Sequence, residues 1–166
     1  MSLLAKIFGA VPKEERTGIS MRDAAGWEVS GIKSKSLPEF LRALPSLLPE
    51  HSILYLEDTA HSTRDVIAFL ESHAASDTSK VALGTIWPRP KLFHVPITAE
   101  IMGELAGLSE RRVAPEVCIH VHAYRDGRVL LEWHDAFFQE LRISRDITED
   151  KVAEFSRRLG AKYRRV

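Results

Sequence analysis

Four side chains with metal-ligand chemistry lie on two adjoining stretches of the sequence, 116–124 and 128–135. They carry thiol, imidazole and carboxylate groups, which bind zinc and other divalent transition metals, and they are Cys118, His120, Glu132 and His134. Two imidazoles and a carboxylate around an ion with an open position suit metal-assisted hydrolysis. The spacing matches no established motif such as HExxH or paired CxxC. The alternative is a polar face without metal, on which His120 and Glu132 make an ordinary cross-strand pair.

The two stretches are predicted to form a β-hairpin. Apolar and polar residues alternate from 117 to 124, which is the period of a half-buried strand, and Arg125-Asp126-Gly127 follow as a turn. Gly127 suits a left-handed backbone, so we expect a three-residue loop closed by a glycine bulge. In that register Val121 faces Leu131, whereas a two-residue loop would set it against Glu132. The expected pairs on the polar face are His122 with Leu130, His120 with Glu132, and Cys118 with His134.

The polar face of the hairpin is also a predicted binding surface. Its members are His120, His122, Tyr124, Arg128, Glu132 and His134. If helices cover only the apolar face of the sheet, this face stays open to solvent. A histidine-rich face then offers pH-sensitive contacts to a protein or a small-molecule partner. Leu130 is apolar and is expected on the same face, so a homodimer interface is an alternative use of this surface.

Two further groups of polar residues are secondary candidates, namely Glu57, Asp58 and His61 in one loop and His94 in a later strand. Adjacent carboxylates beside an imidazole suit a divalent cation or acid–base catalysis. A carboxylate in such a loop also commonly satisfies backbone amides at a helix start. His94 would join the hairpin histidines if its strand lies beside the hairpin, and would otherwise make a structural hydrogen bond.

The composition is that of an ordinary globular domain. The chain has 166 residues, 45% of them hydrophobic and 28% charged, and Lys plus Arg equals Asp plus Glu at 23 each. No overall charge therefore attracts nucleic acid or an acidic membrane, and the basic residues near the C-terminus give no strong nucleic-acid signal. The single cysteine excludes an internal disulfide, and we expect a cytoplasmic protein. No apolar run approaches the roughly 18 residues of a membrane span.

Several enzyme classes have no support in the sequence. The phosphate-binding patterns GxxxxGK[ST] and GxGxxG are absent, and so is the GxSxG elbow of a serine hydrolase family. Cys118 as a nucleophile would have His120 or His134 as its base. A cysteine in the middle of a strand, however, lacks the helix N-terminus that commonly lowers a thiol pKa.

The remaining elements predict an α+β fold: a mixed, largely antiparallel sheet with helices packed mainly on one face. Helices are expected after the capping residues Ser36, Ser62, Thr98 and Thr148. Further strands are expected near 27–33, 52–57, 81–87, 92–97 and 138–144. The chain from 53 through the second of these helices to 81 fits a right-handed parallel crossover. Residues 1–35 are expected to form an N-terminal helix and a polar lead-in packed on a single α+β domain, 36–166.

The sequence leaves two functional hypotheses. The first is a non-catalytic module that binds a protein or ligand through the exposed histidine-rich face of the hairpin. The alternative is a small metal-dependent enzyme, hydrolase-like, with a His/Glu/His site formed by His120, Glu132 and His134 and a divalent transition metal as its cofactor.

Overall fold

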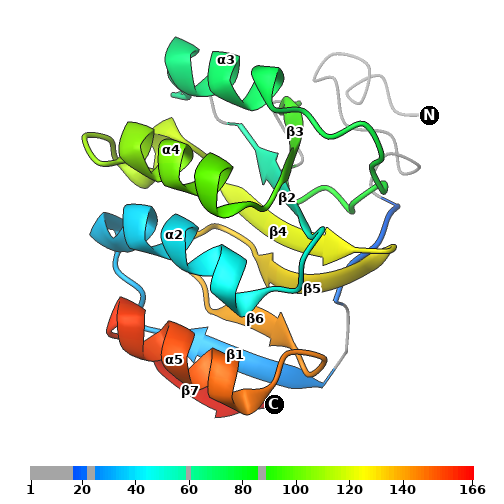
Figure 1. Ribbon diagram of the computed structural model, residues 1–166, viewed down its shortest axis with the longest axis vertical. Helices are drawn as coiled ribbons and strands as arrows, with labels where there is room; N and C mark the ends of the chain where they lie inside the picture. The colour runs from blue at the N-terminus through cyan, green and yellow to red at the C-terminus, as the bar shows by residue number, and fades with distance from the viewer. Residues whose placement is uncertain (1–16, 22–24, 59–60, 86–88) are drawn as a thin grey trace, which may run out of the picture.

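A seven-stranded sheet forms the centre of the computed structural model, which describes residues 17–21, 25–58, 61–85 and 89–166 (Figure 1). The strand order is β3-β2-β4-β5-β6-β1-β7, and every neighbouring pair is antiparallel. The strands are β1 (Gly26–Ser30), β2 (Ile53–Glu57), β3 (Leu92–Pro96), β4 (His120–Arg125), β5 (Arg128–Trp133), β6 (Leu141–Ser144) and β7 (Lys162–Arg165). The predicted α+β class is confirmed.

Four helices of the described chain cover one face of the sheet (Figure 1), and they are α2 (Leu37–Leu47), α3 (Arg64–Ser72), α4 (Ala99–Ser109) and α5 (Glu149–Leu159). Three of them begin directly after the predicted capping residues Ser36, Thr98 and Thr148, whereas α3 has Thr63 rather than the predicted Ser62 as its N-cap. Thr98 Oγ1 accepts the backbone N–H of Ile101 at 3.2 Å, and Gly160, at φ 61°, ends α5 in the left-handed conformation. The main core lies between these helices and the sheet, with Phe40 against Trp133 at its centre. Among the described helices, none is long and apolar enough to cross a membrane.

The turn of the β4–β5 hairpin is shorter than predicted. Asp126 and Gly127, at φ 49° and 72°, form a two-residue turn between the paired residues Arg125 and Arg128. Positive φ at both central positions is typical of the type I′ turn, whose twist matches that of the flanking strands. The predicted three-residue loop is therefore wrong.

A β-bulge nevertheless keeps the apolar face of the hairpin intact. Tyr124 pairs with Val129 but Ala123 pairs with Leu131, so Leu130 is the extra residue. Leu130 is buried in the main core rather than on the polar face, so it supplies no surface for a homodimer. Beyond the bulge, the polar face pairs His122 with Glu132 instead of His120 with Glu132.

Two segments, 17–21 and 78–85, cross the opposite face of the sheet, and we call them the cover segments. They bond to each other from Ile19 N–H to Lys80 O at 2.9 Å and from Ala82 N–H to Ile19 O at 3.1 Å. Met21 and Val81 pack with Tyr55, Tyr124 and Val129 in a second, smaller core. Val81 makes only an isolated bridge to Ile19, so the predicted parallel crossover onto a strand at 81–87 is wrong for the described residues.

The first and last strands of the described chain, β1 and β7, are neighbours at one edge of the sheet. The strand predicted near 27–33 is present as β1, between β6 and β7. The basic residues after Gly160 form β7 rather than a frayed tail, with Val29 opposite Tyr163. Lys and Arg on an outermost strand discourage pairing with other chains. The helix predicted near the N-terminus lies outside the described residues.

Candidate functional site

A line of polar side chains crosses the sheet on the face opposite the helices. Successive strands pair His94 with Tyr55, Tyr55 with His122, His122 with Glu132, Glu132 with Arg142, Arg142 with Glu28, and Glu28 with Arg164. Directly opposed side chains in a sheet are about 4.5–5.5 Å apart at Cβ. The line therefore gathers groups that are far apart in the sequence into one continuous set of neighbours.

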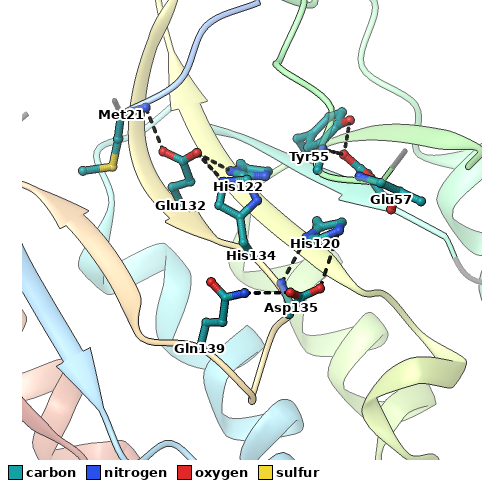
Figure 2. A network of polar contacts seen from close by, with 11 residues as sticks. Met21, Tyr55, Glu57, His120, His122, Glu132, His134, Asp135 and Gln139 are labelled. Carbon is teal, nitrogen blue, oxygen red and sulfur yellow. Dashed lines mark hydrogen bonds and ion pairs between the residues drawn. The ribbon is translucent and has the colours of Figure 1, made fainter. Parts of the chain in front are cut away.

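Three residues of the β4–β5 hairpin form a cluster of metal-ligand groups (Figure 2), namely His122, Glu132 and His134. One ligand atom from each lies within 4.8 Å of the other two. Glu132 Oε1 is 2.6 Å from His134 Nε2 and 3.9 Å from His122 Nδ1. The second carboxylate oxygen accepts the backbone N–H of Met21 at 2.8 Å. Glu132 is thus the centre of the cluster and also holds one cover segment in place.

His122 is the least satisfied member of this cluster. Its side chain is 1% exposed, and neither ring nitrogen has a hydrogen-bond partner among the described residues. A buried polar group without a partner costs about 1–3 kcal/mol. Burial lowers the pKa of His122 to about 3, with the nearby His134 acting in the same direction. The imidazole is therefore neutral at physiological pH, which is the form that binds a metal ion.

Glu132 and His134 form an ion pair beside the neutral His122. Burial on its own would raise the pKa of Glu132, but the hydrogen bonds from His134 and the Met21 amide outweigh it and bring that pKa down to about 2. The same contact with Glu132 raises the pKa of His134. The cluster therefore holds one negative carboxylate that is available as an anionic ligand.

Glu57 and His120 form a second layer next to the cluster. Glu57 is fully buried, and its carboxylate accepts hydrogen bonds from the Tyr55 hydroxyl at 2.9 Å and from the amides of Gly84 and Thr85 at 2.7 and 2.8 Å. These bonds fix the second cover segment to β2. A Cβ at Gly84 would lie 2.6 Å from the His120 ring, so this close approach requires glycine.

His120 is oriented by the residue that follows the hairpin. Its Nδ1 accepts the backbone N–H of Asp135 at 3.0 Å, and burial lowers its pKa. The neutral ring then carries its proton on Nε2, which lies 3.8 Å from Asp135 Oδ1. Figure 2 shows Asp135 in turn bonded to Gln139, whose amide nitrogen donates to Oδ2 at 2.7 Å.

An open cavity of about 550 Å³ gives access to one side of this site. Its walls include Gly84, Thr85, His120, His134, Asp135 and Gln139. The side chain of His134 is 40% exposed, whereas His122 and Glu132 lie behind it. A molecule in the cavity would therefore meet His120, His134 and Asp135 first.

The polar face of the hairpin is buried, contrary to the prediction of an exposed binding surface. The cover segments leave His120, His122, Tyr124 and Glu132 with at most 7% of their surface exposed. Of the other two predicted binding residues, His134 is half-buried and Arg128 is exposed at the tip of the hairpin. These residues cannot act together as a surface for a large partner.

Cys118 is wrongly placed by the sequence prediction. It precedes β4, faces the helix side of the sheet and is part of the main core. The chain leaves regular strand geometry between η3 (Ala114–Glu116) and His120, so the alternation that would carry Cys118 onto the polar face is interrupted. Cys118 therefore is not one of the metal-ligand groups.

Cys118 is expected to be inert toward thiol reagents in the folded protein. It is 3% exposed, and burial raises the pKa of its thiol to about 12, so almost no thiolate is present at neutral pH. Labelling by Ellman's reagent should be at least about 100-fold slower in buffer than in 6 M guanidinium, because reaction requires opening of the core. Comparable rates in the two conditions would contradict this burial.

Of the secondary candidates Glu57, Asp58, His61 and His94, only Glu57 lies directly next to the cluster. Glu57 lies in the second layer described above. Asp58 instead accepts the backbone N–H of Lys91 at 2.6 Å, and His61 is exposed, so neither joins the cluster. His94 is separated from the hairpin by β2, and its Nδ1 contacts the hydroxyl of Tyr124 at 2.8 Å.

Sequence reasoning missed the contributions of Met21, Tyr55 and Gly84. Tyr55 could have been found, because it is two residues from Glu57 and so shares its face of β2. Met21 contributes only its backbone N–H to Glu132, and no side-chain pattern signals such a contact. Gly84 is required by the His120 ring, which is close only in the folded chain.

Comparisons with known proteins found no matching family model, no similar curated protein and no similar solved structure.

Proposed function

We propose that this protein binds one divalent transition-metal ion through His122, Glu132 and His134 and uses it in metal-assisted hydrolysis. The observation that carries the proposal is that His122 is buried with no hydrogen bond to either ring nitrogen in the described parts of the chain. Two imidazoles and one carboxylate form the ligand set of well-known catalytic zinc sites. The same set also accommodates iron or manganese.

The distances support binding after small side-chain movements. Two ligand atoms on one ion at about 2.1 Å can be at most about 4.2 Å apart, and the atoms of the cluster now lie within 4.8 Å of one another. His134 has the most room to move, because its side chain is 40% exposed. An ion between Glu132 and the two rings would replace their present contacts and give His122 a partner.

The groups at the cavity suit a hydrolytic reaction. A bound divalent ion supplies a Lewis acid and lowers the pKa of water. Asp135, with a side chain 46% exposed, is positioned to accept a proton from that water. The Nε2–H of His120 can donate a hydrogen bond to the oxygen on which negative charge develops. His120 and Asp135 are thus the proposed catalytic residues next to the metal ligands.

The proposal is tested by metal content after reconstitution. We expect purified protein incubated with Zn²⁺, Mn²⁺ or anaerobic Fe²⁺ and then dialysed to retain one of these ions near-stoichiometrically by elemental mass spectrometry. His122→Ala and the isosteric Glu132→Gln should weaken binding by more than the about 10–100-fold that outer-sphere partners contribute. His73→Ala is the matched control, because His73 directly follows α3, outside the cluster, and this variant should bind as the wild type does.

Activity and folding are measured on the same samples. Loaded protein should hydrolyse p-nitrophenyl acetate or bis(p-nitrophenyl) phosphate faster than chelated protein, and Asp135→Asn should lower the rate while retaining the ion. Far-UV circular dichroism checks that each variant is folded. Absence of retained metal in the folded wild type, or full retention in both cluster variants, would overturn the metal site.

A further inference from the structure

Among the described residues that line the open cavity of about 550 Å³, none is a lysine or an arginine. The polar side chains of that wall belong to Thr85, His120, His134, Asp135 and Gln139. Of these groups, His134 has a raised pKa through its hydrogen bond to Glu132, and the two side chains lie 2.6 Å apart. The positive charge of His134 is therefore compensated, and an anionic ligand finds no free cation among these groups.

Three carboxylates lie in or next to the wall of this cavity. Asp135 is part of the wall, and Glu132 is bonded to His134, which lines it. Glu57 accepts two backbone N–H groups of the cover segment 78–85, at the point where that segment lines the cavity. The three negative charges exceed the two positive charges of a divalent ion, so even a loaded site has no net positive charge to attract an anionic substrate.

The carboxylate of Asp135 is fixed at the cavity. The side-chain amide nitrogen of Gln139 donates to its Oδ2 at 2.7 Å, and its own backbone N–H donates to His120 Nδ1 at 3.0 Å. Asp135 and Phe137 have left-handed φ angles of 42° and 74°, a strained backbone of the kind found at functional sites. Phe137 packs on the ring of Trp133 at a centroid distance of 4.4 Å, which holds this loop in place. The negative charge therefore stays at the cavity when a ligand approaches.

The hydrogen-bonding groups of the wall suit a reaction at a carbonyl group. Addition of water to a carbonyl develops negative charge on a single oxygen, which one ion and one N–H donor can stabilise. The neutral ring of His120 provides one such donor, its Nε2–H. Phosphoryl transfer spreads more negative charge over three oxygens and commonly relies on lysine or arginine for its stabilisation. The described wall has no such side chain, so it is matched to the first reaction and not to the second.

We propose that the substrate of this site is an uncharged carboxylic amide or ester and not a phosphate ester. The inference rests on the proposed function and names the class of bond that is hydrolysed. Water adds to the carbonyl carbon and gives one proton to Asp135. The C–N or C–O bond to the leaving group then breaks, and that proton passes to the leaving nitrogen or oxygen. The products are a carboxylic acid, which ionises in solution, and an amine or an alcohol.

The first test compares benzamide with benzoate, which have the same shape and differ by one charge. Both are titrated by NMR into the full chain after treatment with a chelator, at constant ionic strength, so binding does not depend on the metal site. We expect benzamide to cause saturable shifts of the amides of 84–85, 119–120 and 134–139, and benzoate to bind at least tenfold more weakly. Equal or tighter binding of benzoate, or no saturable shifts with benzamide, would overturn the proposal.

Three variants test whether charge sets this preference. Gln139→Lys adds a cation beside Asp135 and should reduce the preference for benzamide at least fivefold. Gln139→Met removes the amide without adding charge. Gly107→Lys adds the same charge on α4, on the helix side of the sheet, where an added Cβ meets nothing within 4 Å. Both controls should keep the wild-type preference. A preference that is unchanged in Gln139→Lys, or lost equally in either control, would contradict the role of the wall charge.

The second test measures turnover by metal-loaded protein relative to the free ion. p-Nitrophenyl acetate is uncharged, the mono-p-nitrophenyl ester of adipic acid has the same scissile ester with a remote carboxylate, and bis(p-nitrophenyl) phosphate is an anionic phosphodiester. We expect the acceleration of the acetate to exceed that of either anion at least tenfold. Greater acceleration of an anion would overturn this substrate class and leave metal-assisted hydrolysis in place. No acceleration of any of the three would instead contradict the proposed hydrolysis and, with it, this assignment.

Discussion

Glu57→Ala is expected to lower the free energy of unfolding by about 3–5 kcal/mol, which is large for a single polar residue. The carboxylate is fully buried and accepts three hydrogen bonds, from the Tyr55 hydroxyl and from the amides of Gly84 and Thr85. Its removal leaves those donors in the protein interior without an acceptor. Each donor that is not hydrogen-bonded by water instead lowers the stability by about 1–3 kcal/mol. Urea unfolding followed by tryptophan fluorescence measures the change.

Two further substitutions separate the loss of these hydrogen bonds from other effects. Glu57→Gln keeps the shape and one acceptor oxygen but turns an NH₂ group toward a donor, so it should cost less than the alanine variant. Glu50→Ala removes a carboxylate from an exposed position and should change stability by at most about 0.5 kcal/mol. If Glu57→Ala matched Glu50→Ala, the anchoring of residues 84–85 by Glu57 would be ruled out.

Metal-free protein is expected to lose stability as the pH falls from about 6.5 toward 4.5, with His122 contributing up to one proton. Burial lowers the folded-state pKa of His122 to about 3, well below the ordinary histidine value of 6.5. In this window the unfolded chain protonates His122 and the folded chain does not, so acid favours unfolding. One such proton corresponds to a slope of about 1.4 kcal/mol per pH unit. Urea unfolding at several pH values, with chelator present, gives that slope.

The share due to His122 is obtained by difference, because other groups titrate nearby. His94 and His120 also have lowered pKa values and act in the same direction, and Glu132 adds to the loss below about pH 4.5. His134 has a raised pKa, so its contribution is present below pH 6.5 and is lost as the pH rises. His122→Phe should therefore flatten the curve between pH 6.5 and 4.5.

A core substitution serves as the comparison for that slope. Leu70→Val removes one methylene from a fully packed position and changes no titrating group, so it should displace the whole curve without changing its slope. An unchanged slope in His122→Phe would mean that His122 is protonated in the folded state and is not the buried neutral group described above.

The sequence predicts this fold well where the signals are local. The caps at Ser36, Thr98 and Thr148 and the left-handed Gly160 locate helices because each depends on a few adjacent residues. The hairpin is only partly correct: Val121, Ala123, Leu131 and Trp133 share the apolar face as predicted, but the predicted Val121–Leu131 pair is wrong, because Val121 pairs with Trp133, and Val129 lies on the opposite face beside Tyr124. The class of the fold follows from these elements alone.

The candidate site is only half predicted, because its geometry depends on contacts between distant residues. Glu132 and His134 are predicted members of the cluster, but the bulge at Leu130 brings His122 rather than His120 next to them as the second imidazole. No residue type demands that bulge. The burial of the polar face depends on the cover segments, and Met21 reaches Glu132 across 111 positions of sequence. Periodicity within one strand cannot reveal such a partner.

The extra residue in β5 has a consequence for how this chain can change length over evolution. A deletion inside a strand ordinarily moves every later side chain to the opposite face. Loss of Leu130 would instead leave Tyr124 opposite Val129 and Ala123 opposite Leu131, with His122 still facing Glu132. At position 130 a lineage can therefore lose or regain one residue at the cost of one buried leucine, while the cluster of His122, Glu132 and His134 stays in register.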